Sequence, residues 1–415
     1  MKTQEAAVSL LDAIVLAGEW EGYQVAGAKI LESGDGGRCL EIELAPHGTQ
    51  PLICAGCGCA SNRIHETIKR RIRDLPILDF QTLLIVPRRR LLCPRCGPSV
   101  ELLSWLDRYS RVTRRLAGSV ARLCAVLPVK HVAAFFHLSW DQVKEIDKRA
   151  LQQRVGTVDL SAVEVLGMDE FALHKGHRYA TVVVEPYRKE VLWIGKGRSR
   201  ESIRPFFELL GIDGCKRLKA VVMDMNASYE EEIKEHSPQA AIVYDLFHVV
   251  AKYGREVIDR VRIDEAKRLG ADKKARRIIK TARWLLLRNR ENVKAADRLR
   301  LQELLEANST LLTVYLLKDD LKQLWRCKRT EEAAAFWEQW YSRAMESGIE
   351  PLMLFARRLK GYLAGILNHC RWPLHTGLLE GINNKIKVIK RMAYGFRDHE
   401  YFFLKIRAAF PGIPG

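Results

Sequence analysis

Apolar runs with the length and composition of β-strands are concentrated between residues 162 and 244. In chain order they are AVEVLGM, YATVVVE, EVLWIG, LKAVVMD and AAIVYD. Two stretches with the spacing of helices, SIRPFFELLG and SYEEEIKEH, separate the third run from the fourth and the fourth from the fifth. A long helix is predicted from Leu246. Three consecutive strands, followed by strands that alternate with helices, indicate a mixed sheet covered by helices.

Helical periodicity also marks the segment before this sheet. Three helices are predicted, over residues 112–127, over residues 130–136 and from Ser139 onward. Ser139 opens the third helix as a capping box, in which its hydroxyl accepts from the amide of Gln142 and the Gln142 side chain reaches back. A tight turn before the last helix is typical of a helix-turn-helix, although three-helix bundles that do not bind DNA are equally compatible. The residues at the end that would enter a major groove include Trp140, Gln142 and Lys144.

The sequence after the sheet is typical of a helical domain. The 112 residues between Pro238 and Pro351 contain no proline and three glycines, and they are rich in Ala, Leu, Arg, Lys and Glu. The tryptophans expected to fill the core of this domain are Trp284, Trp325, Trp337 and Trp340. A last helix is predicted from about residue 378 to residue 392.

Positive charge is the feature of the composition that indicates a partner. The chain has 68 Lys and Arg against 50 Asp and Glu, a formal net charge of +18. Residues 1–60 hold three basic and eight acidic side chains, whereas residues 61–130 hold fifteen basic and five acidic ones. This excess favours a polyanion such as DNA, although any single cluster is also typical of a solvated surface. The candidate phosphate contacts here are Arg88, Arg89 and Arg90.

No stretch approaches the roughly 20 uninterrupted apolar residues of a membrane span. The N-terminus also lacks the basic-then-apolar order of a signal peptide. We therefore expect a cytoplasmic protein without membrane contact, whose ten Cys are ligands or buried side chains rather than disulfides.

Two C-x-x-C pairs carry the clearest metal-binding signal. Four thiolates from Cys54, Cys57, Cys93 and Cys96 match the tetrahedral, sulfur-rich coordination of a structural Zn²⁺ ion. The interval between the pairs is long enough for two strands, over residues 64–73 and 77–86. Cys59 is an alternative ligand. The cysteines expected to be buried without a metal are Cys39, Cys124, Cys215, Cys327 and Cys370.

A pair of aspartates ends two of the predicted strands. Asp169 follows the first apolar run and Asp224 the fourth. The first and fourth strands are neighbours in a ribonuclease-H-like sheet, whose strand order this pattern matches. Neighbouring carboxylates repel each other, and a site that keeps both ionised usually holds divalent cations such as Mg²⁺.

The last predicted helix offers a third carboxylate. Glu380 stands near its start, and Asn384, Lys387 and Arg391 follow on the same face. This face could place a phosphodiester beside metal ions, with Lys387, Lys390 and Arg391 as phosphate contacts. A solvated basic face that contains one Glu is the alternative.

Two further polar groups lie near strand ends and have more than one interpretation. Asp245 ends the fifth strand, so it could replace Asp224 as a metal ligand, or it could cap the following helix with His248 beside it. Three side chains in the turn between the first two strands could contact substrate or form a plain polar hairpin. They are His174, Lys175 and His177.

The chain resembles the ISL-three family of bacterial insertion-sequence transposases over nearly its whole length after about residue 40. The resemblance is carried, in order, by both C-x-x-C pairs, the helix-turn-helix, GMDEF, VVMDMNASY, DLFHVV and LEGINNKIKVIKRMAYGF. It implies a ribonuclease-H-like DDE catalytic domain interrupted by a helical insertion, with the triad on Asp169, Asp224 and Glu380. The D-x-x-H signature of the family falls on Asp245 and His248, which with Asn384 are expected to support the site.

The resemblance also implies an activity and its partners. We expect a DNA transposase that binds the terminal inverted repeats of an insertion sequence and performs two-metal strand cleavage and transfer into target DNA, with two Mg²⁺ or Mn²⁺ ions. A homodimer or larger assembly on DNA, within the bacterial nucleoid, is expected. Alternatives are a non-enzymatic zinc-ribbon regulator and a metal-dependent nuclease without strand transfer.

Together these expectations describe a multidomain α+β protein. Its predicted parts are an N-terminal region with a zinc ribbon (1–105), a helix-turn-helix domain (106–157), the first part of a ribonuclease-H-like mixed α/β catalytic core (158–263), an all-α insertion (264–368) and the last helix and tail of the core (369–415).

Overall fold

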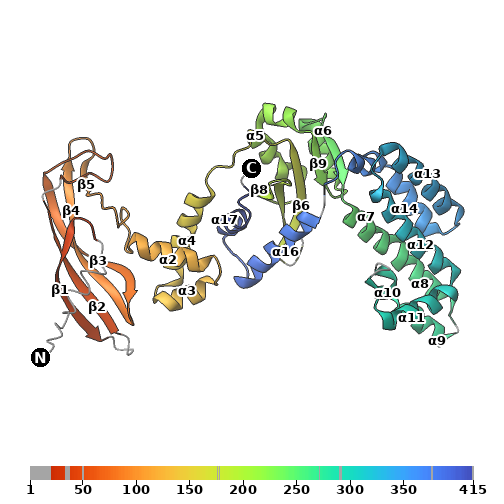
Figure 1. The fold of residues 1–415 in the computed structure, drawn as a ribbon, viewed down its shortest axis with the longest axis horizontal. Helices are drawn as coiled ribbons and strands as arrows, with labels where there is room; N and C mark the ends of the chain where they lie inside the picture. The colour runs from red at the N-terminus through yellow and green to blue at the C-terminus, as the bar shows by residue number, and fades with distance from the viewer. Residues whose placement is uncertain are drawn as a thin grey trace, which may run out of the picture. The chain divides into compact units, whose positions relative to one another are not determined.

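The computed structural model describes residues 20–32, 38–48, 51–174, 176, 178–270, 272–288, 292–374 and 377–413. The chain divides into two compact units (Figure 1). The first comprises residues 1–156 with 390–404, and the second comprises residues 157–389 with 405–415. None of the described helices is both long and apolar enough to cross a membrane.

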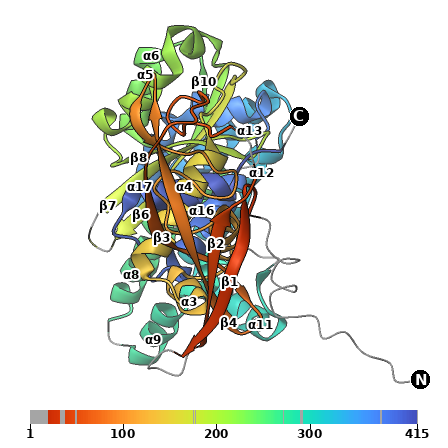
Figure 2. The same cartoon turned by 90° about the vertical axis from the view of Figure 1, so that its left-hand side faces the viewer.

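A five-stranded sheet forms the first part of the first unit. Its strands are β1 (Tyr23–Glu32), β2 (Arg38–Pro46), β3 (Ile64–Ile77), β4 (Phe80–Cys93) and β5 (Gly97–Val100). The order is β1-β2-β4-β3, and β5 pairs with the end of β4 (Figures 1 and 2). Alternate residues such as Ile42 and Leu84 face a core that includes Trp20 and Trp105. The two strands predicted between the cysteine pairs are confirmed, and both extend further than the sequence indicates.

Three short helices follow this sheet in the first unit. They are α2 (Arg114–Cys124), α3 (Val129–Phe136) and α4 (Trp140–Val155), and they enclose an apolar core around Val120, Val132 and Val143. The turn before α4 passes through His137 with a φ of 49°, in the left-handed region. The capping box of Ser139 and Gln142 is present as predicted.

A segment from the far end of the chain completes this helical part. The helix α17 (His399–Ala409) begins within the first unit. There the Tyr401 hydroxyl donates to the buried carboxylate of Asp147 on α4, and Lys148 pairs with Glu400 at 2.7 Å. The sequence pattern does not predict this helix.

The second unit is built on a mixed sheet with helices. Its strands are β6 (Val165–His174), β7 (Arg178–Glu185), β8 (Glu190–Lys196), β9 (Ala220–Met223) and β10 (Ala241–Tyr244), in the order β10-β9-β6-β7-β8. The first three are antiparallel, whereas β9 runs parallel to β6 and β10 parallel to β9. The connecting helices are α5 (Arg200–Arg217) and α6 (Ala227–His236). All five predicted strands, and the pairing of the first with the fourth, are confirmed.

The rest of the second unit is helical. After α7 (Leu246–Tyr253) and a π-helical turn (Gly254–Ile258), the helices are α8 (Asp259–Arg268), α9 (Lys273–Thr281), α10 (Arg283–Leu287), α11 (Ala295–Glu306), α12 (Ser309–Gln323), α13 (Thr330–Glu346), α14 (Glu350–Lys360), α15 (Leu363–Leu367) and α16 (Gly377–Met392). Trp337 and Trp340 are fully buried in the core, as predicted. Trp284 is not a core residue, because 66% of its surface is exposed.

Candidate zinc site and active site

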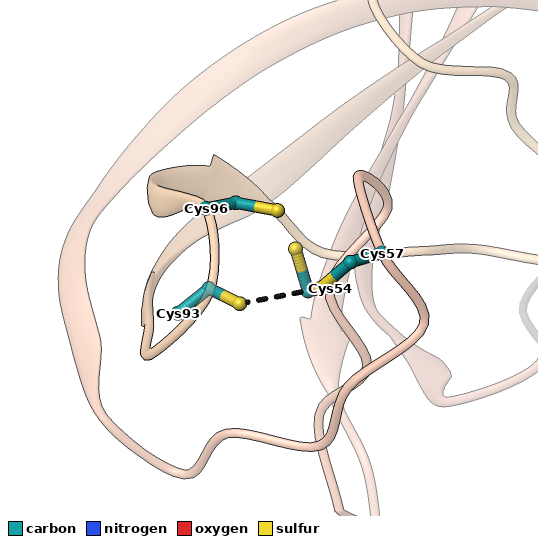
Figure 3. Close-up of side chains that lie close together, drawn as sticks. All are labelled: Cys54, Cys57, Cys93 and Cys96. Atoms are coloured by element: carbon teal, nitrogen blue, oxygen red, sulfur yellow. Dashed lines mark hydrogen bonds between the residues drawn. The ribbon is translucent and has the colours of Figure 1, made fainter.

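The four predicted zinc ligands lie together in the first unit (Figure 3). Cys54 and Cys57 stand in a turn closed by the bridge between Ile53 and Ala60, while Cys93 ends β4 and Cys96 lies in the turn to β5. All four sulfur atoms lie within 4.8 Å of one another. No other set of three or more His, Cys, Asp or Glu is gathered in this way in the described parts of the chain, and Cys59 is not a member of the set.

The surroundings of Cys54 favour its thiolate, whereas a hydrogen bond with Cys57 raises the pKa of the Cys96 thiol. The hydroxyl of Ser99, together with the backbone N–H groups of Gly56 and Cys57, lowers the pKa of the Cys54 thiol to about 6. Gly56 N lies 3.3 Å from Cys54 Sγ. Four sulfurs with no open position suit a structural Zn²⁺ ion, which binds thiolates tetrahedrally.

The two aspartates of the candidate active site lie on adjacent strands of the second unit. The sequence predicts Asp169 at the end of its strand, but β6 continues to His174 because it forms a hairpin with β7. Its pairing with β9 nevertheless ends at Gly167. Asp224 follows β9 directly. Both carboxylates therefore lie just beyond the end of the parallel pairing between β6 and β9.

The pKa values of both aspartates are shifted in the same direction. The pKa of Asp169 is raised to about 6, mainly by burial and also by the carboxylates of Asp224 and Asp245, while the backbone N–H of Glu170 and the imidazole of His248 oppose the shift. Burial also raises the pKa of Asp224. Oδ1 of Asp224 is buried and accepts no hydrogen bond from any described group. A buried carboxylate and a half-buried one that raises its pKa, with one unpaired oxygen, fit a hard divalent cation.

Asp245 has the supporting role that the sequence allows as one alternative. Its Oδ1 accepts from the backbone N–H of Phe247 at 2.7 Å and caps α7. Its Oδ2 lies 3.2 Å from Nδ1 of His248, and this hydrogen bond is the main reason that the pKa of His248 is raised. Asp245 thus uses both oxygens within the protein, whereas Asp224 does not.

Helix α16 brings Glu380 to this part of the sheet. A Cβ on Gly167 would lie 3.0 Å from Leu379, so α16 packs closely on β6. One helical turn later, Nδ2 of Asn383 donates to Oδ2 of Asp169 at 2.6 Å. Leu379 and Asn383, one turn apart on α16, therefore contact Gly167 and Asp169, which lie on the same face of β6.

Glu380 itself is exposed. The carboxylate oxygens of Asp169, Asp224 and Glu380 are not all within 4.8 Å of one another. The structure therefore places the helix of Glu380 beside the two aspartates, but the three carboxylates are not gathered around one point. The residue that sequence reasoning missed is Asn383, because the prediction assigns the supporting role to Asn384. Asn384 is exposed, and its Oδ1 accepts instead from Lys387 at 3.3 Å.

The predicted DNA contacts on the helix-turn-helix differ in their availability. Trp140 is 49% exposed. Lys144 forms an ion pair with Asp398 at 2.9 Å, and the Gln142 side chain is used in the capping box. Trp140 and Gln142 are both exposed, whereas Lys144 is half-buried.

The three arginines of the cluster at 88–90 all have acidic partners in the structure. Arg88 is buried, and Arg88 and Arg89 both form ion pairs with the buried carboxylate of Glu101. Their positive charges are therefore balanced within the first unit. Arg90 pairs with Glu66 at 2.6 Å. The sequence cannot show these partners, because Glu101 lies on a different segment.

Among the remaining candidates, Lys387 and Arg391 are exposed on α16 and Lys390 is half-buried. His174 ends β6. Lys175 and His177 lie outside the described residues.

Comparison with known proteins decides the family. The DDE transposase model of the ISL3 family matches residues 166–406. Models for the helix-turn-helix domain of the same family and for the zinc finger of IS204/IS1001/IS1096/IS1165 transposases match residues 101–151 and 50–96. The chain belongs to the ISL3 transposase family.

Relatives of this transposase are similar along nearly their whole length. The transposase for insertion sequence element IS1001 of Bordetella parapertussis is 58% identical over 396 residues, which cover 95% of this chain and 97% of that protein. The transposase for insertion sequence element IS1557 of Mycobacterium tuberculosis (strain ATCC 25618 / H37Rv) is 26% identical over 413 residues, 92% of each chain. The zinc-ribbon match includes all four clustered cysteines.

Proposed function

We propose that this transposase cleaves DNA at the terminal inverted repeats of its insertion sequence and joins the freed ends to target DNA. Asp169, Asp224 and Glu380 would hold two Mg²⁺ or Mn²⁺ ions. The hydrogen bond from Asn383 to Asp169 carries this proposal, because it fixes the helix of Glu380 beside the paired aspartates. The sheet and its helical region would then be a ribonuclease-H-like core and its insertion.

The residues around the carboxylates have separate tasks in this scheme. When bound, such ions activate the attacking hydroxyl and stabilise the leaving 3′ oxygen. Asn383 holds Oδ2 of Asp169, which leaves the orientation of that carboxylate fixed. Asp245 and His248 keep α7 in place, and in its protonated form His248 would favour ionised carboxylates at both aspartates. Lys387 and Arg391 on α16 would contact the phosphodiester.

The first unit would recognise the DNA. The helix-turn-helix supplies Trp140 to a major groove and the zinc ribbon holds adjoining DNA. Because two ends must be joined, we propose that at least two copies assemble on the DNA in the nucleoid.

The test uses the purified chain and a duplex that ends in the terminal repeat of its element. Asp169→Asn, Asp224→Asn and Glu380→Gln should each abolish Mg²⁺-dependent cleavage and leave duplex binding within about threefold, since phosphate contacts dominate affinity. Cleavage without joining would indicate a nuclease, and binding without any cleavage a regulator. Either result would contradict the proposal.

A further inference from the structure

The helical region of the second unit contains a basic surface that neither the zinc ribbon nor the carboxylate site uses. Helix α9 has five basic residues among nine and no acidic one. Four of the five, Lys273, Lys274, Arg277 and Lys280, are exposed. The helix lies at the end of the helical region remote from the sheet (Figures 1 and 2).

The exposed cations follow one face of the helix. Lys273, Arg277 and Lys280 are separated by four and three positions, which places them one above another. At 1.5 Å per residue they span roughly 10 Å. This is about the rise of three nucleotides along one strand of a DNA duplex.

These side chains also have no acidic partner among the described residues. No described carboxylate lies within 4.0 Å of any of the four, by contrast with Arg343, which pairs with Asp320 at 2.7 Å, and Arg260, which pairs with Asp264 at 3.3 Å. Asp272 stands next to the cluster, but its Oδ1 accepts from the backbone N–H groups of Lys274 and Ala275 and caps the helix.

The surroundings extend the same surface. Arg268 is largely exposed on the preceding helix, with 73% of its side chain accessible. The exposed indole of Trp284 follows α9, and the Arg283 guanidinium lies 4.9 Å from its ring. Four neighbouring unpaired cations repel one another, and a row of phosphates would neutralise their charge. Binding would also release counterions from the nucleic acid, which favours association.

We propose that the face formed by Lys273, Lys274, Arg277 and Lys280 binds the sugar-phosphate backbone of duplex DNA, at a place separate from the cleavage site. The proposal rests on the proposed function in so far as the protein acts on DNA. A backbone contact of this kind carries no sequence information, so it adds affinity for any duplex.

The test measures the salt dependence of binding to a fluorescent duplex of random sequence by anisotropy. We expect the triple variant Lys273→Gln, Arg277→Gln, Lys280→Gln to bind more weakly and to lower the slope of log affinity against log salt by about 2 to 3, since each phosphate contact contributes about 0.9. At saturating end-containing DNA its cleavage rate should stay unchanged.

The control removes three charges that are already paired. The variant Arg260→Gln, Arg329→Gln, Arg343→Gln loses cations that lie within 4.0 Å of Asp264, Glu331 and Asp320, and its slope should change by less than about 1. Circular dichroism and thermal unfolding verify that both variants fold. Equal slopes for the two variants would overturn the inference alone, whereas a wild-type chain that binds no duplex would overturn the proposed function as well.

Discussion

The zinc site and the carboxylate site differ in how closely the fold gathers their candidate metal ligands. Four sulfurs from two turns of one sheet lie within 4.8 Å of one another, whereas the aspartates and Glu380 come from distant segments and do not form such a set. Thiols can be neutral and therefore tolerate close approach, but carboxylates at neutral pH repel. The fold itself therefore gathers the cysteines of the ribbon, whereas cations or DNA would have to close the proposed active site.

The largest effect should come from removing zinc ligands. Structural zinc sites contribute about 10–16 kcal/mol to the folding of small domains, so Cys54→Ser with Cys57→Ser should lose the ion and unfold the ribbon. Elemental analysis and circular dichroism measure both consequences. Cys59→Ser is the matched control and should keep one zinc per chain, because Cys59 is outside the cluster. Full zinc content in the double variant would contradict the site.

Removing a carboxylate should have the opposite effect on stability. Asp224→Asn takes away a buried negative charge near Asp169 and Asp245, so without divalent cations the variant should unfold at the same or a higher temperature than wild type. Its cleavage should fall to background. Mn²⁺ should raise the melting temperature of wild type and not of the variant. Destabilisation like that of the cysteine variants would show that both sites are structural.

Asn383→Ala sharpens the comparison by loosening the link between α16 and β6. Outer residues that orient ligands typically change metal affinity or activity 10- to 100-fold, and we expect a loss of that size in the cleavage rate at saturating DNA. The Mg²⁺ concentration for half-maximal cleavage should rise, while the duplex affinity stays unchanged. Asn383→Asp adds a like charge beside Asp169 and should be worse. A variant that loses folding or DNA affinity in the same proportion would assign Asn383 a structural role only.

The smallest effect concerns pH. Because the pKa of Asp169 is raised to about 6, folding favours its protonated form, and the ion-free protein should become less stable as the pH rises from about 4 to about 6. A cation requires the ionised form, so the affinity for Mn²⁺ should fall about tenfold per pH unit below pH 6, and the stabilisation by Mn²⁺ should decrease with it. Thermal unfolding with and without Mn²⁺ across this range measures both trends. An identical Mn²⁺ effect at about pH 5 and pH 7 would contradict them.

Much of the fold follows from local pattern. Period-two and helical spacing predict β6 to β10 and α2 to α4, because these elements bury one face of a short continuous segment. The two C-x-x-C pairs predict that they lie together for a different reason, since four thiolates match one tetrahedral zinc ion. The strands β1 and β2 and the helix α17 do not emerge in this way, since what stabilises them is contact with segments elsewhere, such as that of Tyr401 with Asp147.

The candidate site is predictable only in part. Strand ends identify Asp169 and Asp224, but the choice between Asn383 and Asn384 depends on which side of α16 faces β6, and adjacent residues of a helix point about 100° apart. The prediction for the arginines also depends on residues from another segment. The sequence alone favours Arg88 and Arg89 as phosphate contacts, and the structure shows in addition that both form ion pairs with Glu101.

We propose that Glu380 closes the site with Asp169 and Asp224 when metal and DNA are bound. The decisive measurement is a crystal structure of the chain with its end DNA and Mn²⁺, analysed by anomalous scattering. We expect manganese coordinated by oxygens of all three carboxylates, with Asn383 still bonded to Asp169. Manganese held by Asp245 in place of Glu380, with Glu380 facing solvent, would contradict it.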